Sequence, residues 1–377
     1  MSKLKTKKKR IVAPVISVFL AIVIGYLSFN YVCGTDDIIE YIEKNVFPVE
    51  SEHDFAVTRD EEDGFYTFQM QDVDAADTEL RVLQLTDIHL TCGYPTYFLD
   101  VAAVDAVYEL VRATRPDLIV LTGDIVSPII FTGATGNSAL IARAVGALFT
   151  RMQIPWTVIY GNHDSEGFMS KSELSDYYES LDYCLFQRGP HDIDGEGNTV
   201  IKVKNKDGSL RHALFFLDSH GGMPGGYDNP HENQVAWYKD TVDALFGRYG
   251  AFESILYQHI PPDQQRTLAE RYENGDTRVE CLYGELGKRV ASGTDYGLYD
   301  ALVEKGTTKH VFFGHDHTNL AAYRDTTDGI TLSYSPSIDF STYVFTRFTS
   351  YQRGGTVVNI GTDGSARVSQ IYSDDLH

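Results

Sequence analysis

The chain has 377 residues, of which 43% are hydrophobic and 23% charged, a composition that excludes an intrinsically disordered protein. It carries 53 Asp and Glu against 32 Lys and Arg, and so acidic a chain repels polyanions, which argues against stable binding of DNA or RNA. Four cysteines without a CxxC pair exclude a disulfide framework and a zinc knuckle.

The amino-terminal segment combines a basic start with an apolar stretch. Lys and Arg crowd residues 1–10, and residues 11–33 carry no charge. A helix rising about 1.5 Å per residue over this stretch can cross a hydrocarbon core about 30 Å thick. We therefore expect a cytoplasmic basic segment at 1–10, a single-pass signal anchor at 11–33 in the cell membrane, and an extracytoplasmic body. The alternative is a secreted protein released by signal cleavage, although residues 28–33 lack a clear small-x-small site.

Residues 34–78 are expected to form a juxtamembrane helix and a hairpin. Thr35 is a candidate N-cap, and apolar residues at helical spacing extend to Val46. The segments 55–58 and 65–68 flank an acidic turn that we interpret as solvent-exposed.

Strands and helices then alternate within one large domain at 79–377. Strands are expected at 80–85, 118–121 and 156–160, with helices between them that begin at Asp100 and Ser138. A third helix starts after Ser170, which forms a capping-box pattern with Glu173. Such βαβ units predict a parallel sheet, and ligands bind beyond the carboxyl ends of strands in sheets of this kind.

The second half of the chain is less regular. Strands are expected at 200–203 and 213–217, a helix at 233–245, and short β segments after residue 317. Residues 260–295 show no strong periodicity and are interpreted as a functional loop region.

Five apolar runs share one feature, because each leads into Asp, His or Asn. The runs are 83–85 before Asp87 and His89, 118–121 before Gly123 and Asp124, 156–160 before Gly161, Asn162, His163 and Asp164, 255–257 before His259, and 311–313 before Gly314, His315, Asp316 and His317. Oxygen and imidazole donors together suit Mn, Fe or Zn ions. Seven ligands are too many for one catalytic ion, whereas two ions that share a carboxylate fit the number.

These five motifs, in this order, resemble those of the calcineurin-like metallophosphoesterases. Residues Ser219, Gly222, Tyr227, Gln234, Trp237 and Tyr238 further resemble the subgroup that includes the Dcr2-type phosphatases. The resemblance implies an α/β fold of two facing mixed β-sheets flanked by helices. It also implies a phosphoester hydrolase with two divalent or mixed-valence metal ions.

The resemblance further implies a role for each motif residue. Asp87, His89 and His317 would hold the first ion, Asn162, His259 and His315 the second, and Asp124 would bridge them. A hydroxide bridging the two ions would attack phosphorus in line with the leaving group. His163 would protonate the leaving oxygen, and Asp164 would orient that imidazole.

Other residues are weighed against this pattern. Purple acid phosphatases carry a Tyr three residues after the bridging Asp, but Ser127 occupies that position, which argues against a ferric tyrosinate site. Cys92 is interpreted as a small loop residue, and His220 and His231 as structural loop histidines.

Three readings of function remain open. The first is a phosphatase for a phosphorylated small molecule or lipid-linked substrate. The second is a phosphodiesterase or pyrophosphatase acting on nucleotides or lipid-linked phosphates. The third, of another class, is a catalytically silent, metal-stabilised surface module that binds a partner.

Overall fold

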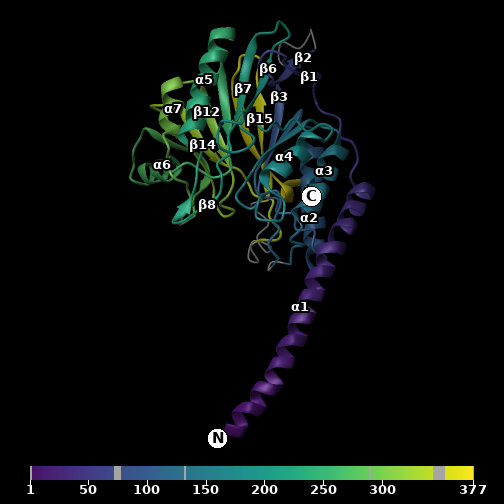
Figure 1. Ribbon diagram of the computed structural model, residues 1–377. Helices are drawn as coiled ribbons and strands as arrows, with labels where there is room; N and C mark the ends of the chain where they lie inside the picture. Colours follow the sequence, from purple (N-terminus) through teal and green to yellow (C-terminus); the bar gives the residue numbers. More distant parts are fainter. Residues whose placement is uncertain (1, 72–77, 131–132, 288–289, 343–352, 377) are drawn as a thin grey trace.

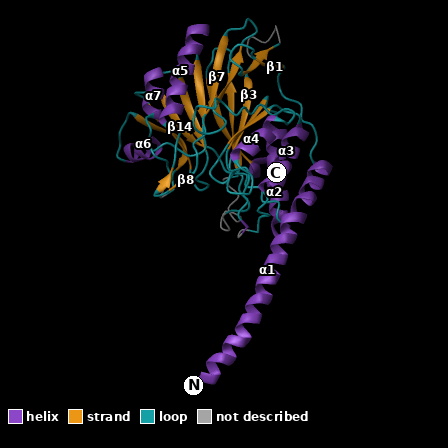
Figure 2. Ribbon diagram, viewed as in Figure 1, coloured by secondary structure: helices purple, strands orange, loops and turns teal. Residues whose placement is uncertain are grey.

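The structure is a computed structural model that describes residues 2–71, 78–130, 133–287, 290–342 and 353–376 (Figure 1). Its helices are α1 (Ser2–Asn45), α2 (Tyr97–Thr114), α3 (Ser138–Met152), α4 (Lys171–Glu179), α5 (Glu232–Tyr249), α6 (Gln264–Glu273) and α7 (Leu298–Lys305), with 3-10 turns η1 (Tyr94–Thr96) and η4 (Ser373–Leu376). Figure 2 shows the strands in the middle of the body with helices on either side.

The described strands form two large sheets and one small ribbon. The larger sheet has nine strands in the order β1 (Phe55–Arg59), β2 (Tyr66–Met70), β6 (Thr199–Lys204), β7 (Leu210–Phe216), β10 (Glu253–Tyr257), β12 (Thr308–Phe313), β14 (Ile330–Tyr334), β13 (Leu320–Asp325) and β11 (Val279–Glu285). The smaller sheet has five, in the order β16 (Ala366–Tyr372), β15 (Gly354–Ile360), β3 (Leu80–Leu85), β4 (Leu118–Thr122) and β5 (Trp156–Ile159). A short ribbon pairs β8 (Gly222–Met223) with β9 (Gly226–Tyr227).

Parallel pairing in both sheets determines where the strand ends lie. In the smaller sheet β3, β4 and β5 are parallel, with Leu83 opposite Ile119 and Ile119 opposite Trp156. In the larger sheet β7, β10, β12 and β14 are parallel. The carboxyl ends of these strands therefore gather at one edge of each sheet, as the βαβ pattern predicts.

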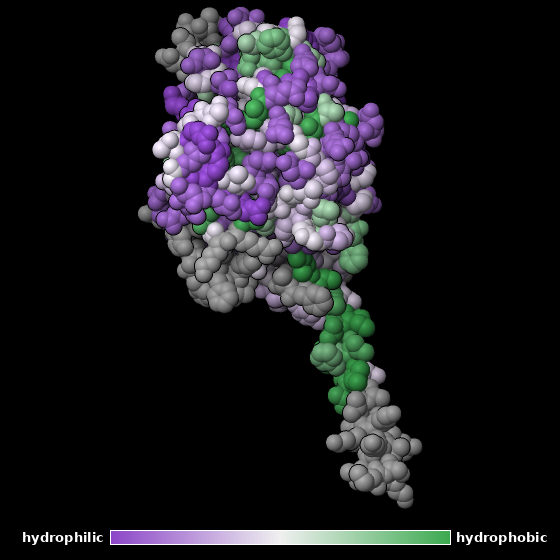
Figure 3. Space-filling view, turned by 90° about the vertical axis from the view of Figure 1, so that its left-hand side faces the viewer, coloured by the Kyte–Doolittle hydropathy of each residue, from purple (hydrophilic) through white to green (hydrophobic). Residues whose placement is uncertain are grey.

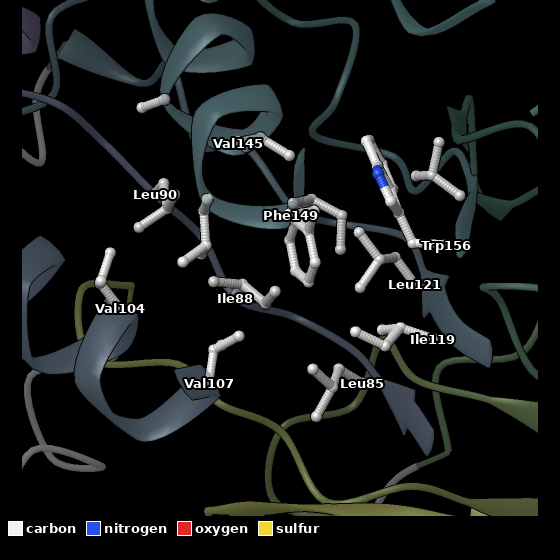
Figure 4. Packing of buried hydrophobic residues seen from close by; sticks show 14 of the residues in the cluster. Leu85, Ile88, Leu90, Val104, Val107, Ile119, Leu121, Val145, Phe149 and Trp156 are labelled. Atoms are coloured by element: carbon white, nitrogen blue, oxygen red, sulfur yellow. The ribbon is translucent and has the colours of Figure 1, made fainter. Parts of the chain in front are cut away.

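Three hydrophobic clusters divide the body into layers. Val82 and Val120 of the smaller sheet pack with Leu214 and Phe312 of the larger one, so the two sheets face each other. The opposite face of the smaller sheet packs against α2 and α3, where Leu121 of β4 meets Phe149 of α3 (Figure 4). Helices α5, α6 and α7 cover the outer face of the larger sheet. The expected mixed α/β architecture with sheets flanked by helices is confirmed.

Helix α1 differs from the expectation of two separate segments. It is one helix from Ser2 to Asn45, so Thr35 lies inside it rather than at its start. Its last turns remain helical because Ile38 and Ile42 are buried against the body. Its window Pro14–Tyr31 is apolar and long enough to cross a membrane, and only 6% of that window is buried. Figure 3 shows this hydrophobic stretch below a largely hydrophilic face of the body.

Three further expectations need correction. Helix α2 begins at Tyr97, so Asp100 is not its N-cap; the carboxylate is buried and accepts a hydrogen bond from Thr91 N (2.8 Å). Residues 260–295 contain α6 and β11 rather than a loop alone. The acidic turn between β1 and β2 is not merely solvated, because Asp60 and Asp63 both pair with the buried Lys202 Nζ (2.6 Å each).

Candidate metal centre

The seven expected ligands come from the ends of five parallel strands in both sheets. Asp87 and His89 follow β3, Asp124 follows β4 and Asn162 follows β5, all from the smaller sheet. His259 follows β10, and His315 and His317 follow β12 of the larger sheet. The site therefore lies where the ligand-bearing edges of the two sheets meet.

The backbone at these strand ends turns sharply. Asp87, His89, Asp124 and His315 all have positive φ, between 51° and 75°, a conformation that non-glycine residues rarely adopt. Hydrogen bonds between neighbouring loops hold these turns, since Asp87 N donates to Gly123 O (3.0 Å) and His89 N to Asp124 O (3.0 Å). Such local strain concentrates at functional sites, where surrounding contacts maintain it.

The first cluster of ligand atoms comprises Asp87, His89, Asp124 and His317, with one atom from each lying within 4.8 Å of all the others. His317 Nε2 lies 3.2 Å from Asp87 Oδ1 and 3.0 Å from His89 Nε2. His89 Nε2 lies 3.8 Å from Asp124 Oδ2. Two imidazole nitrogens and two carboxylates thus converge on one point.

The second cluster comprises Asp124, His259 and His315, again with ligand atoms within 4.8 Å of one another. His259 Nε2 lies 3.2 Å from Asp124 Oδ2 and 3.3 Å from Asn162 Oδ1, which places the amide oxygen beside this cluster. Asp124 belongs to both clusters. The structure therefore brings all seven expected residues together around one shared carboxylate.

The chemistry of these residues fits metal ions. Asp87, His89, Asp124 and His259 are at most 1% exposed, and burying carboxylates is costly without compensating positive charge. Burial alone would lower the pKa of His259, but Asp124 and Asp87 outweigh it and raise that pKa to about 9. Among the residues that the structure describes, His315 Nδ1 is buried without a hydrogen-bond partner. Buried oxygen and imidazole donors of this kind could bind two metal ions.

Groups behind the ligands orient two of the imidazoles. His317 Nδ1 lies 2.9 Å from Asp339 Oδ2, and His259 Nδ1 lies 2.8 Å from Thr122 O, which accepts its proton. In each case the Nε2 atom is directed toward the ligand cluster, an arrangement typical of metal-binding histidines. The sequence analysis did not identify Asp339. This residue follows the apolar run of β14, just as the candidate ligands follow the apolar runs of their own strands.

His163 and Asp164 contact different partners from those expected. The Asp164 carboxylate accepts four backbone amides, from Gly161 (2.6 Å), Asp124 (2.9 Å), Ile125 (2.9 Å) and Val126 (3.0 Å). The expected contact with the His163 ring is absent among the described residues. Instead His163 Nδ1 lies 2.7 Å from Glu166 Oε2, a partner that sequence analysis did not single out.

The His163 ring is nevertheless close to the clusters. Its Nε2 lies 4.0 Å from Asp124 Oδ2, and its backbone N donates to Asp124 Oδ1 (2.8 Å). Burial alone would lower the pKa of His163, but the charges of Asp124 and Glu166 raise it. The ring side chain is 24% exposed, so it lies at the open side of the site.

The remaining candidates lie outside the two clusters. His220 and His231 stack on each other with ring centroids 4.1 Å apart, and His231 Nδ1 contacts Asp194 (2.8 Å), which supports the structural interpretation. Cys92 is buried and belongs to neither cluster. Ser127 is also buried, with its backbone N donating to Leu90 O (2.8 Å).

The chain belongs to the calcineurin-like phosphoesterase family, whose model matches residues 80–319. Over 70% of its length it is 28% identical to a protein of Arabidopsis thaliana named probable inactive purple acid phosphatase 29, of which the match covers 73%. It is 26% identical to the phosphatase DCR2 of Saccharomyces cerevisiae, over 66% of this chain and 45% of that protein. This match confirms the expected resemblance to Dcr2-type phosphatases. This chain shares the fold of a dimetal phosphatase from Danio rerio, with a TM-score of 0.50 and 12% sequence identity. The match covers 78% of this chain and all of the other.

Proposed function

We propose that this protein is a dinuclear metal-dependent phosphoesterase. The observation that carries the proposal is the shared position of Asp124, whose carboxylate belongs to both clusters of buried ligand atoms. Two ions held in this way would lower the pKa of a shared water and neutralise phosphoryl oxygens during in-line attack. Mn, Fe and Zn are the ions that the donor set favours.

The chain's own residues supply the rest of the chemistry. Asp87, His89 and His317 would bind one ion, and Asn162, His259 and His315 the other, with His317 oriented by Asp339. The protonated His163 ring would donate a proton to the leaving oxygen from the open side of the site. Asp164 would act indirectly, because its carboxylate holds the backbone around Asp124.

The amino-terminal helix supports a membrane location for this activity. Residues 1–10 are basic and precede the exposed apolar window Pro14–Tyr31, which is the arrangement of a signal anchor. We propose that the basic end is cytoplasmic, that the helix crosses the cell membrane once, and that the body acts outside the cytoplasm on a phosphorylated small molecule or lipid-linked substrate.

The name of the Arabidopsis thaliana relative favours a second candidate, a catalytically silent binding module. A relative at 28% identity is named as probably inactive, and this chain could share that property. This module would bind metal and a partner without hydrolysing phosphoesters.

Turnover of p-nitrophenyl phosphate and of its bis ester separates these functions. We expect metal-dependent hydrolysis by the full-length chain, and the ratio of the two rates distinguishes a phosphatase from a phosphodiesterase. His163→Ala should lower kcat by about 100-fold or more, the loss typical of a missing general acid, at unchanged metal content.

The matched control is His220→Ala, which replaces a neighbouring loop histidine outside both clusters. It should leave the metal content unchanged and lower the rate far less than His163→Ala does. Full activity in His163→Ala would remove His163 from the mechanism, and metal binding without any turnover would favour the silent module.

A further inference from the structure

We propose that the mouth of the metal centre faces a lipid bilayer and that its substrate is a phosphoester whose apolar tail lies in that bilayer. The inference rests on the proposed hydrolytic function, to which it adds a substrate class and an orientation. It depends on the direction of α1, on exposed aromatic residues and on the distribution of charge.

Helix α1 runs from the ligand-bearing edge of the smaller sheet toward the opposite edge. At Asn30 it contacts the loops that follow β3 and β4, since Nδ2 donates to Ala134 O (2.9 Å) and Oδ1 accepts from Tyr94 N (2.7 Å). Just beyond its end, Val49 N donates to Met152 O (2.9 Å), next to the amino end of β5. The apolar window Pro14–Tyr31 therefore extends away from the body on the side of the ligands (Figure 1).

The orientation of the body relative to α1 is fixed by several contacts. Asn30 is 1% exposed, and Ile38 and Ile42 are fully buried. Tyr41 Oη donates to Asp105 Oδ1 (2.7 Å), and Arg151 donates to two backbone carbonyls at the end of α1 (2.6 and 2.9 Å). A bilayer around Pro14–Tyr31 would therefore meet the ligand-bearing edge first.

Aromatic side chains project from the body where α1 leaves it. Tyr94, Phe98 and Phe168 are 58%, 63% and 75% exposed. Tyr94 packs edge-on against Phe29 of α1 with ring centroids 5.6 Å apart, and Phe168 against Tyr31 at 6.1 Å. Aromatic rings at the end of an apolar span are typical of the membrane–water interface. We call Tyr94, Phe98 and Phe168 the interfacial aromatics.

Several stretches at the ligand-bearing edge of the body carry no charge. In a chain with 53 acidic residues, the described stretches 90–99, 125–130, 133–142 and 219–227 at the ligand-bearing edge contain no Asp, Glu, Lys or Arg. Loops at the other edge carry charges, among them Lys206, Asp207 and Asp363. Uncharged stretches beside exposed aromatic rings are suited to the headgroup region of a bilayer.

One of the interfacial aromatics lies near the open side of the metal centre. Phe168 belongs to the same loop as His163, and both Asn162 and His163 are partly exposed. The uncharged loop 219–227 also reaches this point, because a Cβ on Gly221 would lie 3.5 Å from Asn162. A lipid phosphoester presents its phosphate at the depth of the headgroups, where this opening would meet it.

Fluorescence quenching tests the orientation without any assay of activity. Phe168→Trp is compared with Phe246→Trp, a matched variant on α5 whose native side chain is 55% exposed. The full-length chain is reconstituted in vesicles of phosphatidylcholine brominated on its acyl chains, and each signal is measured against the parent protein, which contains only Trp156 and Trp237. We expect quenching of Phe168→Trp alone. Equal quenching of both variants, or of neither, would overturn the orientation.

Hydrolysis in the same type of vesicle tests the substrate class. The probes are phosphatidic acid, a lipid phosphomonoester, in phosphatidylcholine vesicles and p-nitrophenyl phosphate in solution. Replacing the three interfacial aromatics by Ser should slow phosphatidic acid hydrolysis by about tenfold, the ratio that corresponds to 1.4 kcal/mol, without changing the rate on p-nitrophenyl phosphate. Phe246→Ser should change neither rate.

The possible failures are distinguishable. Hydrolysis of p-nitrophenyl phosphate without hydrolysis of phosphatidic acid, or equal loss of both in the triple variant, would overturn the substrate class. Absence of turnover with both probes would refute the proposed hydrolytic function, and the quenching experiment would still decide the orientation.

Discussion

Asp164 and Glu166 lie close together in one loop but serve different purposes. The buried Asp164 accepts two backbone amides on each carboxylate oxygen, which joins the loop after β5 to the backbone after β4. Glu166 is partly exposed and contacts the His163 ring. Asp164, which follows His163 in sequence, therefore has a structural role. Glu166, three residues after His163, is the carboxylate that contacts the imidazole.

We predict that Asp164→Asn destabilises the protein by about 3 kcal/mol, because the amide nitrogen would face two N–H donors that lose their acceptor. Glu166→Gln is the matched control, and its effect should stay within about 0.5 kcal/mol because the side chain is partly exposed. Chemical denaturation of the purified full-length variants in the presence of a chelator measures both. Equal stability of the two variants would contradict this role of Asp164.

At the scale of elements, the two sheets are joined away from the metal centre as well. His212 of β7 is fully buried, and its Nδ1 donates to Gly364 O (3.1 Å) in the turn between β15 and β16. Burial lowers the pKa of His212 to about 3. The folded protein therefore holds this imidazole neutral over a pH range in which the unfolded chain binds a proton.

This depressed pKa predicts a stability that depends on pH. The contribution of His212 is fully present above its unfolded pKa of about 6.5 and declines by about 1.4 kcal/mol per pH unit as the pH falls toward 3. Between pH 6.5 and 5 the free energy of unfolding should therefore fall by about 2 kcal/mol more in the parent than in His212→Gln. Denaturation curves at several pH values measure this difference, and parallel pH profiles would show that His212 titrates normally in the fold.

At the scale of the whole molecule, the candidate ions would connect the two halves of the body. Asp87, His89 and Asn162 extend from the smaller sheet, and His259 and His315 from the larger one. Each cluster of ligands includes residues from both sheets. Bound ions would therefore stabilise the assembly of the two sheets as well as support chemistry.

We predict that chelation lowers the thermal midpoint of the parent protein by several degrees. Free metal at 1,000 times its dissociation constant stabilises the folded state by about 4 kcal/mol. Asp124→Asn removes the shared ligand, so its midpoint should respond little to chelator. Differential scanning calorimetry with and without chelator measures both, and an unchanged midpoint in the parent would show that the ions do not join the sheets.

Much of the site and part of the fold could be predicted from the sequence, because the relevant patterns are local. An apolar run followed by Asp, His or Asn identifies a buried strand and the polar group at its end, as at Asp124 and His259. Alternating strands and helices predicted the parallel arrangement that brings these ends together. The capping box at Ser170 and Glu173 is also present at the start of α4.

The misassigned residues depend on contacts between distant parts of the chain. Asp100 has the sequence context of an N-cap, but tertiary contacts extend α2 to Tyr97 and bury the carboxylate against Thr91. The acidic turn at 60–63 was expected to be solvated, and only the pairing of β2 with β6 places Lys202 beneath it. Asp339 lies 22 residues from the histidine it orients, so no local spacing connects them.

The sequence by itself determined the candidate ligand residues, the βαβ order and the apolar amino-terminal segment, because each is encoded in neighbouring residues. Only the tertiary structure decided which carboxylate holds the loop after β5, which residue contacts His163, and which edge of the body lies next to the apolar segment of α1. These features depend on how the strands pack and on where α1 docks. Both are decided by the sum of many contacts between residues that are distant in sequence.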